Sequence, residues 1–370
     1  MNKEKRKCGI VTFHSSHNYG SVLQAYALVK TIQKLGLDTE IIDFRHPHTT
    51  DMYEWRLWSP YKDWKWNLRE FILRGIFKFG KKREKVFNNF IEYILPKSSS
   101  IKSKSDIPDI YDILICGSDQ IWNPNASGEN DPIYYLDFGT TANKFSYAAS
   151  SGSVKFGESN HDYILGCLQM MKSIGVREEF MKDYILQEFQ LQAEVNPDPT
   201  FLLNQTEWTQ IEEIYPHIPT KYLLVYTIQH PKETLSYAKS VAQKLNIPLV
   251  HICNERGITS LLHKETRYNL MNVSPQQFLW LFHHANFIVT NTFHGNMFSI
   301  IFRKNFIHYA INPNDTRIST LHETIGLGHS RMIQPNTDVN MLEYEIDYCP
   351  YESSIQQYIQ KGINFITKNL

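Results

Sequence analysis

The residues best suited to chemistry lie in three short polar segments, and the strongest candidate is the segment 291–296, NTFHGN. It contains His294, whose imidazole exchanges a proton near neutral pH. A single histidine is more often structural, but this one lies between an apolar run typical of a strand and another typical of a helix. We therefore expect His294 to act in catalysis. We expect its neighbours to bind substrate: Asn291, Thr292, Gly295 and Asn296.

A second polar segment, 117–124, follows the apolar run ILIC and contains Asp119. A carboxylate in that position acts as a general base or holds a sugar hydroxyl, or else it caps the next turn. An indole there stacks on a sugar ring in one interpretation and fills the core in the other. We expect Asp119 to be catalytic, with substrate-binding side chains beside it: Ser118, Gln120, Trp122 and Asn123.

The third polar segment, 14–21, precedes a predicted helix. Unpaired backbone N–H groups at a helix N-terminus favour an anion, so this segment is a candidate anion site. Its candidate binding residues are Asn18, Tyr19 and Gly20. The alternative interpretation is an ordinary helix start with Ser21 as the cap.

Two arginines outside these segments, Arg177 and Arg317, are further candidates for substrate binding. A guanidinium group matches carboxylate or phosphate in its geometry, although most arginines are simply solvated. No G-x-G-x-x-G or G-x-x-x-x-G-K-[ST] motif occurs in the chain, so classical dinucleotide and P-loop sites are unsupported.

Each polar segment follows a predicted strand, and these strands span residues 9–13, 110–116 and 287–290. The first is followed by a predicted helix, 21–35, and by another strand, 39–44, which makes a β-α-β unit. Strands and helices also alternate in the second half of the chain. Because ligands bind at the carboxyl ends of parallel strands, we expect an α/β fold of two doubly wound domains facing a cleft.

The expected domain boundary divides the chain into residues 1–204 and 205–370, with a C-terminal helix packing back on the first domain. A helical insertion at about residues 45–95 interrupts the first domain. Within it, residues 53–85 contain ten Lys or Arg against four acids, and four of the seven tryptophans: Trp55, Trp58, Trp64 and Trp66. Either these aromatic side chains pack on the domain, or they form a surface that meets anionic lipid headgroups.

The composition of the 370 residues excludes several classes of protein. Lys plus Arg equals Asp plus Glu at 38 each, so no global field favours nucleic acid as a partner. The five cysteines are widely spaced, with no C-x-x-C pair and no histidines at ligand spacing, so neither a disulfide framework nor a zinc site is expected. No apolar run is long enough for a signal peptide or a membrane span, which predicts a cytoplasmic location.

The same segments carry a family resemblance. In order along the chain, VTFHSSHNYGSVLQAYAL, CGSDQIWNP, VREEF, DPTFLL, TNTFHGNMFSIIF and NDTRISTLHETIGL resemble the bacterial polysaccharide pyruvyl transferases. The match runs from about Gly9 to about Leu327. Their combination is far more specific than any one motif.

This resemblance implies transfer of the enolpyruvyl moiety of phosphoenolpyruvate onto two hydroxyls of a sugar, which gives a cyclic pyruvate ketal and phosphate. The implied acceptor belongs to a surface polysaccharide, such as a capsule or exopolysaccharide, or to its lipid-linked precursor. It also implies two Rossmann-like halves similar to GT-B glycosyltransferases, with no cofactor and no metal. A peripheral position on the inner face of the cytoplasmic membrane would suit a lipid-linked acceptor. Residues equivalent to Arg177 and His294 contact the donor in that family.

One position departs from the family pattern. Characterised members often carry an arginine two residues before the histidine, where this chain has Thr292. Either Arg317, Arg303 or Lys304 supplies the missing cation, or the donor or acceptor differs. Two alternative functions therefore stay open: a nucleotide-sugar-dependent GT-B-type glycosyltransferase, and a non-catalytic glycan-binding assembly protein.

Overall fold

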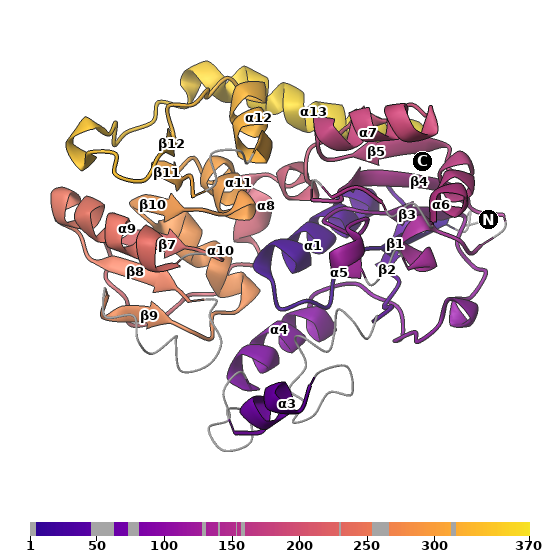
Figure 1. The fold of residues 1–370 in the computed structure, drawn as a ribbon, viewed down its shortest axis with the longest axis horizontal. Helices are drawn as coiled ribbons and strands as arrows, with labels where there is room; N and C mark the ends of the chain where they lie inside the picture. The colour runs from indigo at the N-terminus through magenta and orange to yellow at the C-terminus, as the bar shows by residue number, and fades with distance from the viewer. Residues whose placement is uncertain are drawn as a thin grey trace. The chain divides into compact units, whose positions relative to one another are not determined.

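The computed structural model describes residues 5–45, 63–72, 81–127, 131–139, 141–152, 154–156, 160–228, 231–253, 266–311 and 316–370. The chain divides into two compact units. The first unit contains Met1–Glu54, Asn88–Leu203 and Ile359–Leu370, and the second contains Trp55–Phe87 and Asn204–Tyr358. Each unit has its own sheet (Figure 1).

The first unit is built on a six-stranded parallel sheet in the order β2-β1-β3-β4-β5-β6. The strands are β1 Lys7–Val11, β2 Asp38–Ile41, β3 Ile113–Cys116, β4 Asn143–Ala149, β5 Ser173–Val176 and β6 Glu194–Val195. Its helices are α1 Tyr19–Lys34, α5 Pro124–Ser127, α6 His161–Gln169 and α7 Glu179–Phe189, with short 3-10 turns η2 Lys104–Asp106, η3 Pro132–Tyr135 and η5 Pro199–Leu202.

The second unit repeats this plan with the strand order β12-β11-β10-β7-β8-β9, again all parallel. The strands are β7 Leu223–Tyr226, β8 Leu249–Ile252, β9 Tyr268–Leu270, β10 Phe287–Thr290, β11 Phe306–Tyr309 and β12 Met332–Ile333. The helices are α8 Gln205–Thr209, α9 Pro231–Leu245, α10 Pro275–His284, α11 Phe293–Ile301 and α12 Thr316–Thr324, with 3-10 turns η7 Val339–Met341 and η8 Cys349–Tyr351.

The sequences of the central strands explain the parallel arrangement. ILIC, LLVY, FIVT and FIHY are buried at every position, because helices cover both faces of a parallel sheet. The predicted fold class, two Rossmann-like α/β units, is therefore confirmed. The short strands β6, β9 and β12 lie at or near sheet edges and were not predicted, since two or three residues carry no periodic signal.

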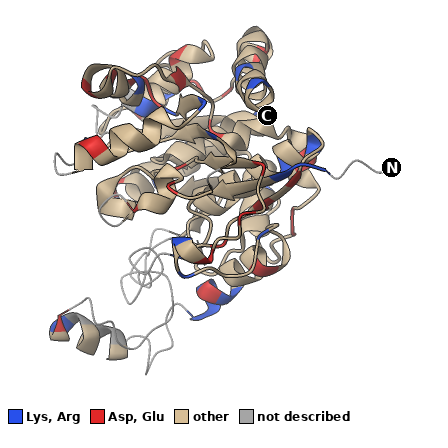
Figure 2. Cartoon of the chain, turned by 90° about the vertical axis from the view of Figure 1, so that its right-hand side faces the viewer, with Lys and Arg blue, Asp and Glu red and all other residues tan. Residues whose placement is uncertain are grey.

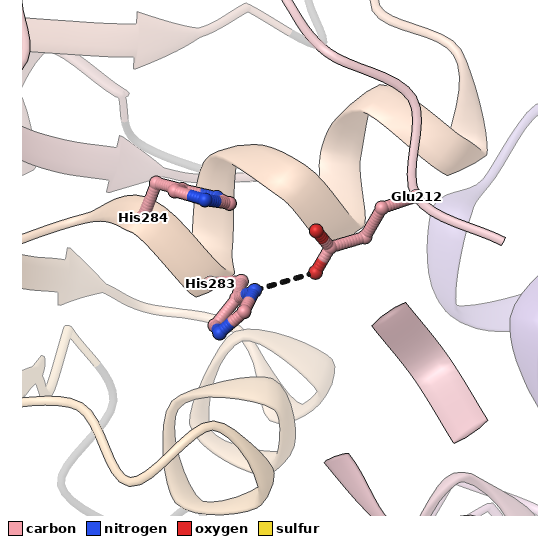
Figure 3. A group of neighbouring side chains, drawn as sticks. All are labelled: Glu212, His283 and His284. Atoms are coloured by element: carbon pink, nitrogen blue, oxygen red, sulfur yellow. Dashed lines mark hydrogen bonds and ion pairs between the residues drawn. The ribbon is translucent and has the colours of Figure 1, made fainter. Parts of the chain in front are cut away.

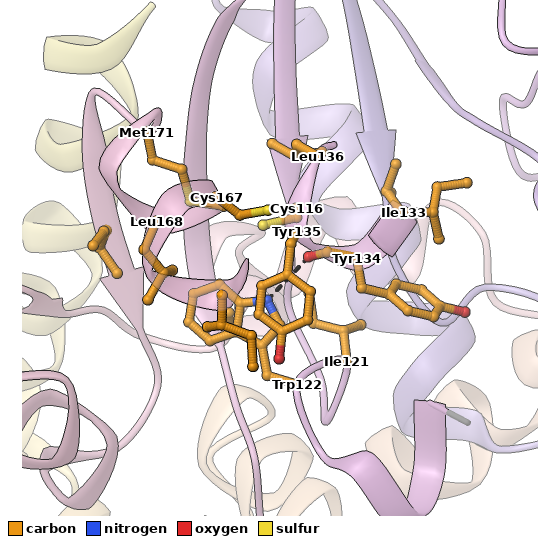
Figure 4. Close-up of a cluster of buried hydrophobic side chains, with 14 of the residues drawn as sticks. Cys116, Ile121, Trp122, Ile133, Tyr134, Tyr135, Leu136, Cys167, Leu168 and Met171 are labelled. Atoms are coloured by element: carbon orange, nitrogen blue, oxygen red, sulfur yellow. Dashed lines mark hydrogen bonds between the residues drawn. The ribbon is translucent and has the colours of Figure 1, made fainter. Parts of the chain in front are cut away.

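The core of the first unit contains many of the aromatic side chains (Figure 4). Trp122 is fully buried, stacks on Tyr135 with ring centroids 5.7 Å apart, and donates its indole N–H to the carbonyl oxygen of Tyr134 at 3.0 Å. Its ring is therefore a core element and is not presented to a sugar, which corrects the substrate-binding role predicted for Trp122.

The last helix, α13, spans Glu352–Asn369, and its final turns belong to the first unit. Phe365 contacts the rings of Phe145 and Tyr147, with centroids 6.2 and 6.1 Å away. Ser173 donates a hydrogen bond to the side chain of Asn369 at 2.7 Å. The C-terminal residues of the chain thus complete the fold of its first half.

The helical insertion contains α3, Trp64–Glu70, and α4, Lys81–Tyr93, whose first turns are rich in Lys and Arg (Figure 2). Trp55, Trp58 and the helix break predicted near residues 75–80 lie outside the described residues. Trp64 is 66% exposed. Among the helices of the described ranges, none is long and apolar enough to cross a membrane.

Candidate functional site

The polar segment after β3 forms the centre of the first unit's candidate site. Asp119 has a left-handed backbone, with φ of 69°. Its carboxylate accepts three hydrogen-bond or ionic contacts: Ser21 Oγ donates to Oδ2 at 2.5 Å, the Gln120 N–H donates to Oδ1 at 2.9 Å, and the Arg177 guanidinium lies 3.8 Å from Oδ1. The Asp119 side chain is 13% exposed. It is thus fixed in direction while still reaching solvent.

Arg177, at the end of β5, is surrounded by acids rather than presented to solvent. Its side chain is 2% exposed and contacts Glu178 at 2.8 Å, Asp198 at 3.2 Å and Asp119 at 3.8 Å. Burial by itself lowers the pKa of Arg177, but the nearby carboxylates of Glu178, Asp198 and Asp119 outweigh it and raise this pKa above its ordinary value. Because three carboxylates surround one guanidinium, the local electrostatic potential is negative.

Asp198, from the DPT motif, is the buried acid of this cluster. It is fully buried. Its Oδ1 accepts hydrogen bonds from the N–H and hydroxyl of Thr200 at 3.0 and 2.9 Å, and its Oδ2 faces Arg177. The neighbouring Ser118 is also fully buried, and donates to the carbonyl oxygen of Ala148 at 2.9 Å. Ser118 thus supports the loop backbone.

The remaining candidates after β3 differ in exposure. Gln120 is half-buried and accepts a hydrogen bond from the Asn123 side chain at 2.9 Å. Asn123 is buried, and its side-chain oxygen caps α5 by accepting from the Asn125 N–H at 3.0 Å. Gln120 therefore remains beside Asp119 as a binding candidate, and Asn123 is occupied in shaping the loop.

The loop before α1 is a helix start capped by Asn18, not by Ser21. The Asn18 side chain accepts from the Gly20 N–H at 2.9 Å. Tyr19 and Gly20 are buried, so they do not border an open anion site. Ser21, in the first turn of α1, donates its hydroxyl to Asp119. The acidic group that lies at this helix N-terminus is therefore the protein's own carboxylate.

In the second unit, the NTFHGN segment links β10 to α11. Thr292 is the N-cap of α11, with its hydroxyl accepting from the Gly295 N–H at 2.9 Å. A Cβ atom at Gly295 would lie 2.1 Å from the Thr290 hydroxyl and 2.6 Å from the Thr292 hydroxyl. Glycine is therefore required at 295 for internal packing, rather than for close approach of a ligand.

His294 lies in the first turn of α11 and is half-buried, as is Asn291. The His294 ring packs edge-on against Phe293, with centroids 5.7 Å apart. The guanidinium of Arg317, in the first turn of α12, lies 6.0 Å from the centroid of the same Phe293 ring. The structure thus brings His294 and Arg317 to one ring at the carboxyl edge of this sheet.

Asn296 is buried and its side chain bonds to three other residues of the protein, so it is not available to bind a ligand. Its amide nitrogen donates to the carbonyl oxygen of Thr292 at 2.7 Å and to His308 Nδ1 at 2.9 Å. Its amide oxygen accepts from His322 Nε2 at 3.1 Å. These contacts connect α11 to β11 and α12, and they were not predicted because their members lie far apart in the sequence.

Two of the three cations considered as replacements at the Thr292 position are engaged elsewhere. Arg303 follows α11 and pairs with Glu352 at 2.8 Å, and Lys304 donates to the carbonyl oxygen of His283 at 2.7 Å. Arg303 and Lys304 both follow the C-terminal end of α11, whereas His294 lies in the first turn of this nine-residue helix. Of the three cations, Arg317 is the one whose guanidinium lies beside the Phe293 ring, in the first turn of α11.

Sequence reasoning missed Glu178 and Asp198 as parts of the first unit's cluster. Both lie within motifs already singled out, VREEF and DPTFLL. The signal that could have found them is a buried arginine that requires acidic partners, since charged groups are almost never buried alone.

The fold and the two polar constellations define a protein with two Rossmann-like α/β units and ionisable side chains at the carboxyl edge of each sheet. The sequence model of the family described as polysaccharide pyruvyl transferase matches residues 18–313. The chain belongs to this family, which confirms the resemblance, and the matched region includes strands of both sheets.

The chain is similar to several solved structures at low sequence identity. UDP-GlcNAc 2-epimerase from Neisseria meningitidis has a TM-score of 0.51 and 11% identity, with 98% of this chain and 99% of that chain covered. The glycosyltransferase SnogD from Streptomyces nogalater has a TM-score of 0.43 and 9% identity, covering 99% and 100%. MurG from Acinetobacter baumannii has a TM-score of 0.42 and 12% identity, with 98% of this chain and 99% of that chain covered. A search of curated proteins returned no match.

Proposed function

We propose that this protein transfers pyruvate from phosphoenolpyruvate to two hydroxyls of one sugar in a surface polysaccharide or its lipid-linked precursor. The single observation that carries the proposal is the family match across residues 18–313. The polar side chains at the carboxyl edges of both sheets support it, because α/β enzymes bind their substrates there.

The proposed reaction balances without a cofactor. Two sugar hydroxyls form C–O bonds to C2 of the enolpyruvyl group, and the bond between C2 and the phosphate oxygen breaks. One hydroxyl proton ends on C3, which becomes the methyl group, and the other leaves with phosphate. The protein must therefore remove a proton from oxygen, deliver one to carbon and stabilise a positive centre at C2.

We assign the general-base role to Asp119. Its carboxylate is held by Ser21 and faces Arg177, yet it keeps an exposed fraction through which a hydroxyl can approach. A base must lie within hydrogen-bond reach of the proton it takes, and a fixed direction reduces the reorganisation needed.

We assign His294 to proton delivery or to the phosphate, with Arg317 as the donor-binding cation. The first turn of α11 carries His294, and the positive end of a helix dipole favours an anionic group. Arg317 lies beside the same Phe293 ring and replaces the arginine that many family members have at the Thr292 position.

We propose that Arg177 acts through Asp119 and does not bind the donor directly. Phosphoenolpyruvate carries a phosphate and a carboxylate, and the three acids around Arg177 would repel both. The guanidinium instead holds the carboxylates in one geometry. This differs from the role that the family resemblance implies for Arg177.

Thermal unfolding in the presence of candidate donors tests the proposal. A ligand that binds only the native state raises its stability by RT ln(1 + [L]/Kd), so phosphoenolpyruvate should raise Tm. The comparison uses inorganic phosphate, pyruvate and a panel of nucleotide sugars at equal concentration. A Tm increase with a nucleotide sugar and none with phosphoenolpyruvate would overturn the proposal in favour of a glycosyltransferase.

A further inference from the structure

A cluster of three possible metal ligands lies in the second unit, at the end of α10. His283 and His284 are its last two residues, and Glu212 follows α8 in the chain. One ligand atom from each residue lies within 4.8 Å of the others. Figure 3 shows the Glu212 carboxylate directed at the His283 ring, with the His284 ring on the same side of the helix end.

The hydrogen bonds of His284 leave one of its ring nitrogens suited to a metal. Its Nδ1 lies 2.9 Å from the carbonyl oxygen of Trp280, which only accepts, so Nδ1 carries the proton. The neutral ring then has its lone pair on Nε2. Metal-binding histidines usually donate their other ring N–H to such a group, which fixes tautomer and orientation. Stacking on Trp280, with centroids 4.4 Å apart, holds the ring further.

His283 and Glu212 are oriented toward each other. His283 Nδ1 lies 2.7 Å from a Glu212 carboxylate oxygen, and the His283 ring stacks on Phe302 with centroids 5.1 Å apart. Burial, together with the Lys304 charge, lowers the pKa of His283. Its Nε2 lies 3.1 Å from the Gln205 side-chain nitrogen, so Nδ1, which faces Glu212, is the His283 atom available to an ion in this cluster. The negative end of the α10 dipole also favours a cation. Lys304 opposes a bound cation through its charge, which limits the affinity.

We propose that Glu212, His283 and His284 bind a divalent transition metal ion of the Zn²⁺ class. Two imidazoles and one carboxylate are a donor set that Zn²⁺ accepts, and a fourth position is left for water. Binding through His283 Nδ1 replaces its hydrogen bond to Glu212: the ion takes the place of the Nδ1 proton, and the two ligand atoms, now 2.7 Å apart, separate to make room for it.

The position of this site indicates a structural role. His284 precedes β10, so the cluster lies at the amino edge of the sheet, whereas the NTFHGN segment follows the carboxyl end of the same strand. An ion here would join the segment after α8 to the end of α10. The inference does not depend on the proposed transferase activity.

Zinc titration of tag-free, chelator-treated protein tests the proposal, with Kd measured by competition against a colorimetric chelator. We expect one Zn²⁺ bound per chain and a raised Tm, and we expect Co²⁺ to give the visible spectrum of a nitrogen- and oxygen-ligated ion. His284→Ala should weaken binding by at least about tenfold. His284 is exposed, so its removal should leave the fold intact. Glu212→Gln should have a similar effect.

The matched control is His329→Ala. His329 forms an exposed two-residue pair with Glu323 at 3.0 Å in the same unit, so its variant should bind Zn²⁺ like the wild type. Equal affinity in the wild type, His284→Ala and Glu212→Gln would overturn the proposal. The absence of wild-type binding at millimolar Zn²⁺ would also overturn it.

Discussion

At the scale of single residues, the structure separates the polar groups that support a loop from those that reach solvent. Ser118, Asn123 and Asn296 are buried and satisfied by the protein itself, whereas Asp119 and His294 keep part of their surface exposed. Spacing alone could not make this distinction, because all five follow predicted strands. Burial depends on contacts with residues far away in the sequence.

Substitution of Asp119 by asparagine should lower kcat/KM by about 10²- to 10⁴-fold, the usual contribution of a general base. The amide keeps the size of the carboxylate, and its oxygen can still accept from the Gln120 N–H while its nitrogen donates to Ser21 Oγ, so Tm should change little. Turnover measured with phosphoenolpyruvate and acceptor checks this. Glu179→Gln, which removes one negative charge from an exposed position of the same unit, is the control and should keep normal turnover. Unchanged turnover in Asp119→Asn would remove Asp119 from the mechanism.

Substitution of Arg177 by methionine should destabilise the protein by about 3–5 kcal/mol, because it leaves buried carboxylates without their cation. Urea unfolding of the variant measures this. Lys182→Met is the control, since Lys182 and its partner Glu179 are both exposed, and it should stay within about 0.5 kcal/mol of wild type. Equal stability of the two variants would show that the acidic cluster does not depend on Arg177.

At the scale of elements, the central strands and the polar segments at their ends were predictable, and the links between elements were not. Apolar runs of four residues identified the central strands, and each candidate segment followed one of them. The contacts of Asn296 with His308 and His322 cross three elements, so no local pattern could reveal them. The same holds for Arg177 and Asp198.

The buried network around Asn296 should make stability fall in mild acid. Burial, with His308, His329 and Arg331 nearby, lowers the pKa of His322 to about 3. The unfolded chain takes up this proton below about pH 6.5 and the folded chain does not, so stability is full above that pH and is lost as pH falls toward 3. Between pH 7 and pH 5 the loss should reach about 2 kcal/mol.

Urea unfolding of wild type and His322→Gln at pH 7 and pH 5 measures this effect. Glutamine can still donate to Asn296 but does not titrate, so its stability should depend less on pH. His217→Gln, which removes an exposed histidine outside this network, should show the pH dependence of the wild type. Identical pH dependence in wild type and His322→Gln would contradict the assignment.

Helix α3 and the two residues after it carry an exposed apolar face next to basic residues. Trp64, Leu68, Phe71 and Ile72 recur at helical spacing and are each at least 40% exposed. Of the two interpretations of the insertion, this exposure favours a lipid-facing surface, and we propose contact with anionic membranes that present a lipid-linked acceptor. The exposed lysines Lys65, Lys81, Lys82 and Lys85 add the required charge.

Sedimentation with anionic liposomes at low salt should retain the protein in the pellet, and neutral liposomes should not. Leu68→Glu combined with Phe71→Glu should release it with an unchanged Tm, because both side chains are exposed. Ile214→Glu, at an exposed apolar position outside the insertion, is the control and should still sediment. Absence of wild-type sedimentation would remove the membrane proposal.

At the scale of the whole molecule, the family match and the repeated parallel sheet agree on one architecture. Each unit places one ionisable candidate at the carboxyl edge of its sheet, Asp119 in the first and His294 in the second. The sequence predicted this division because the motifs fall in both halves. It could not predict the acceptor, because the loops that select a sugar have no shared motif.

The most direct test of the central claim is a single coupled measurement of phosphate release and acceptor mass. The assay contains phosphoenolpyruvate and a panel of free sugars and lipid-linked oligosaccharides. We predict release that requires an acceptor, with the acceptor gaining the mass of one pyruvate less one water, and both signals lost in folded Asp119→Asn and His294→Gln. Near-normal release and product formation in both variants, or consumption of a nucleotide sugar with no pyruvylated product, would contradict the account.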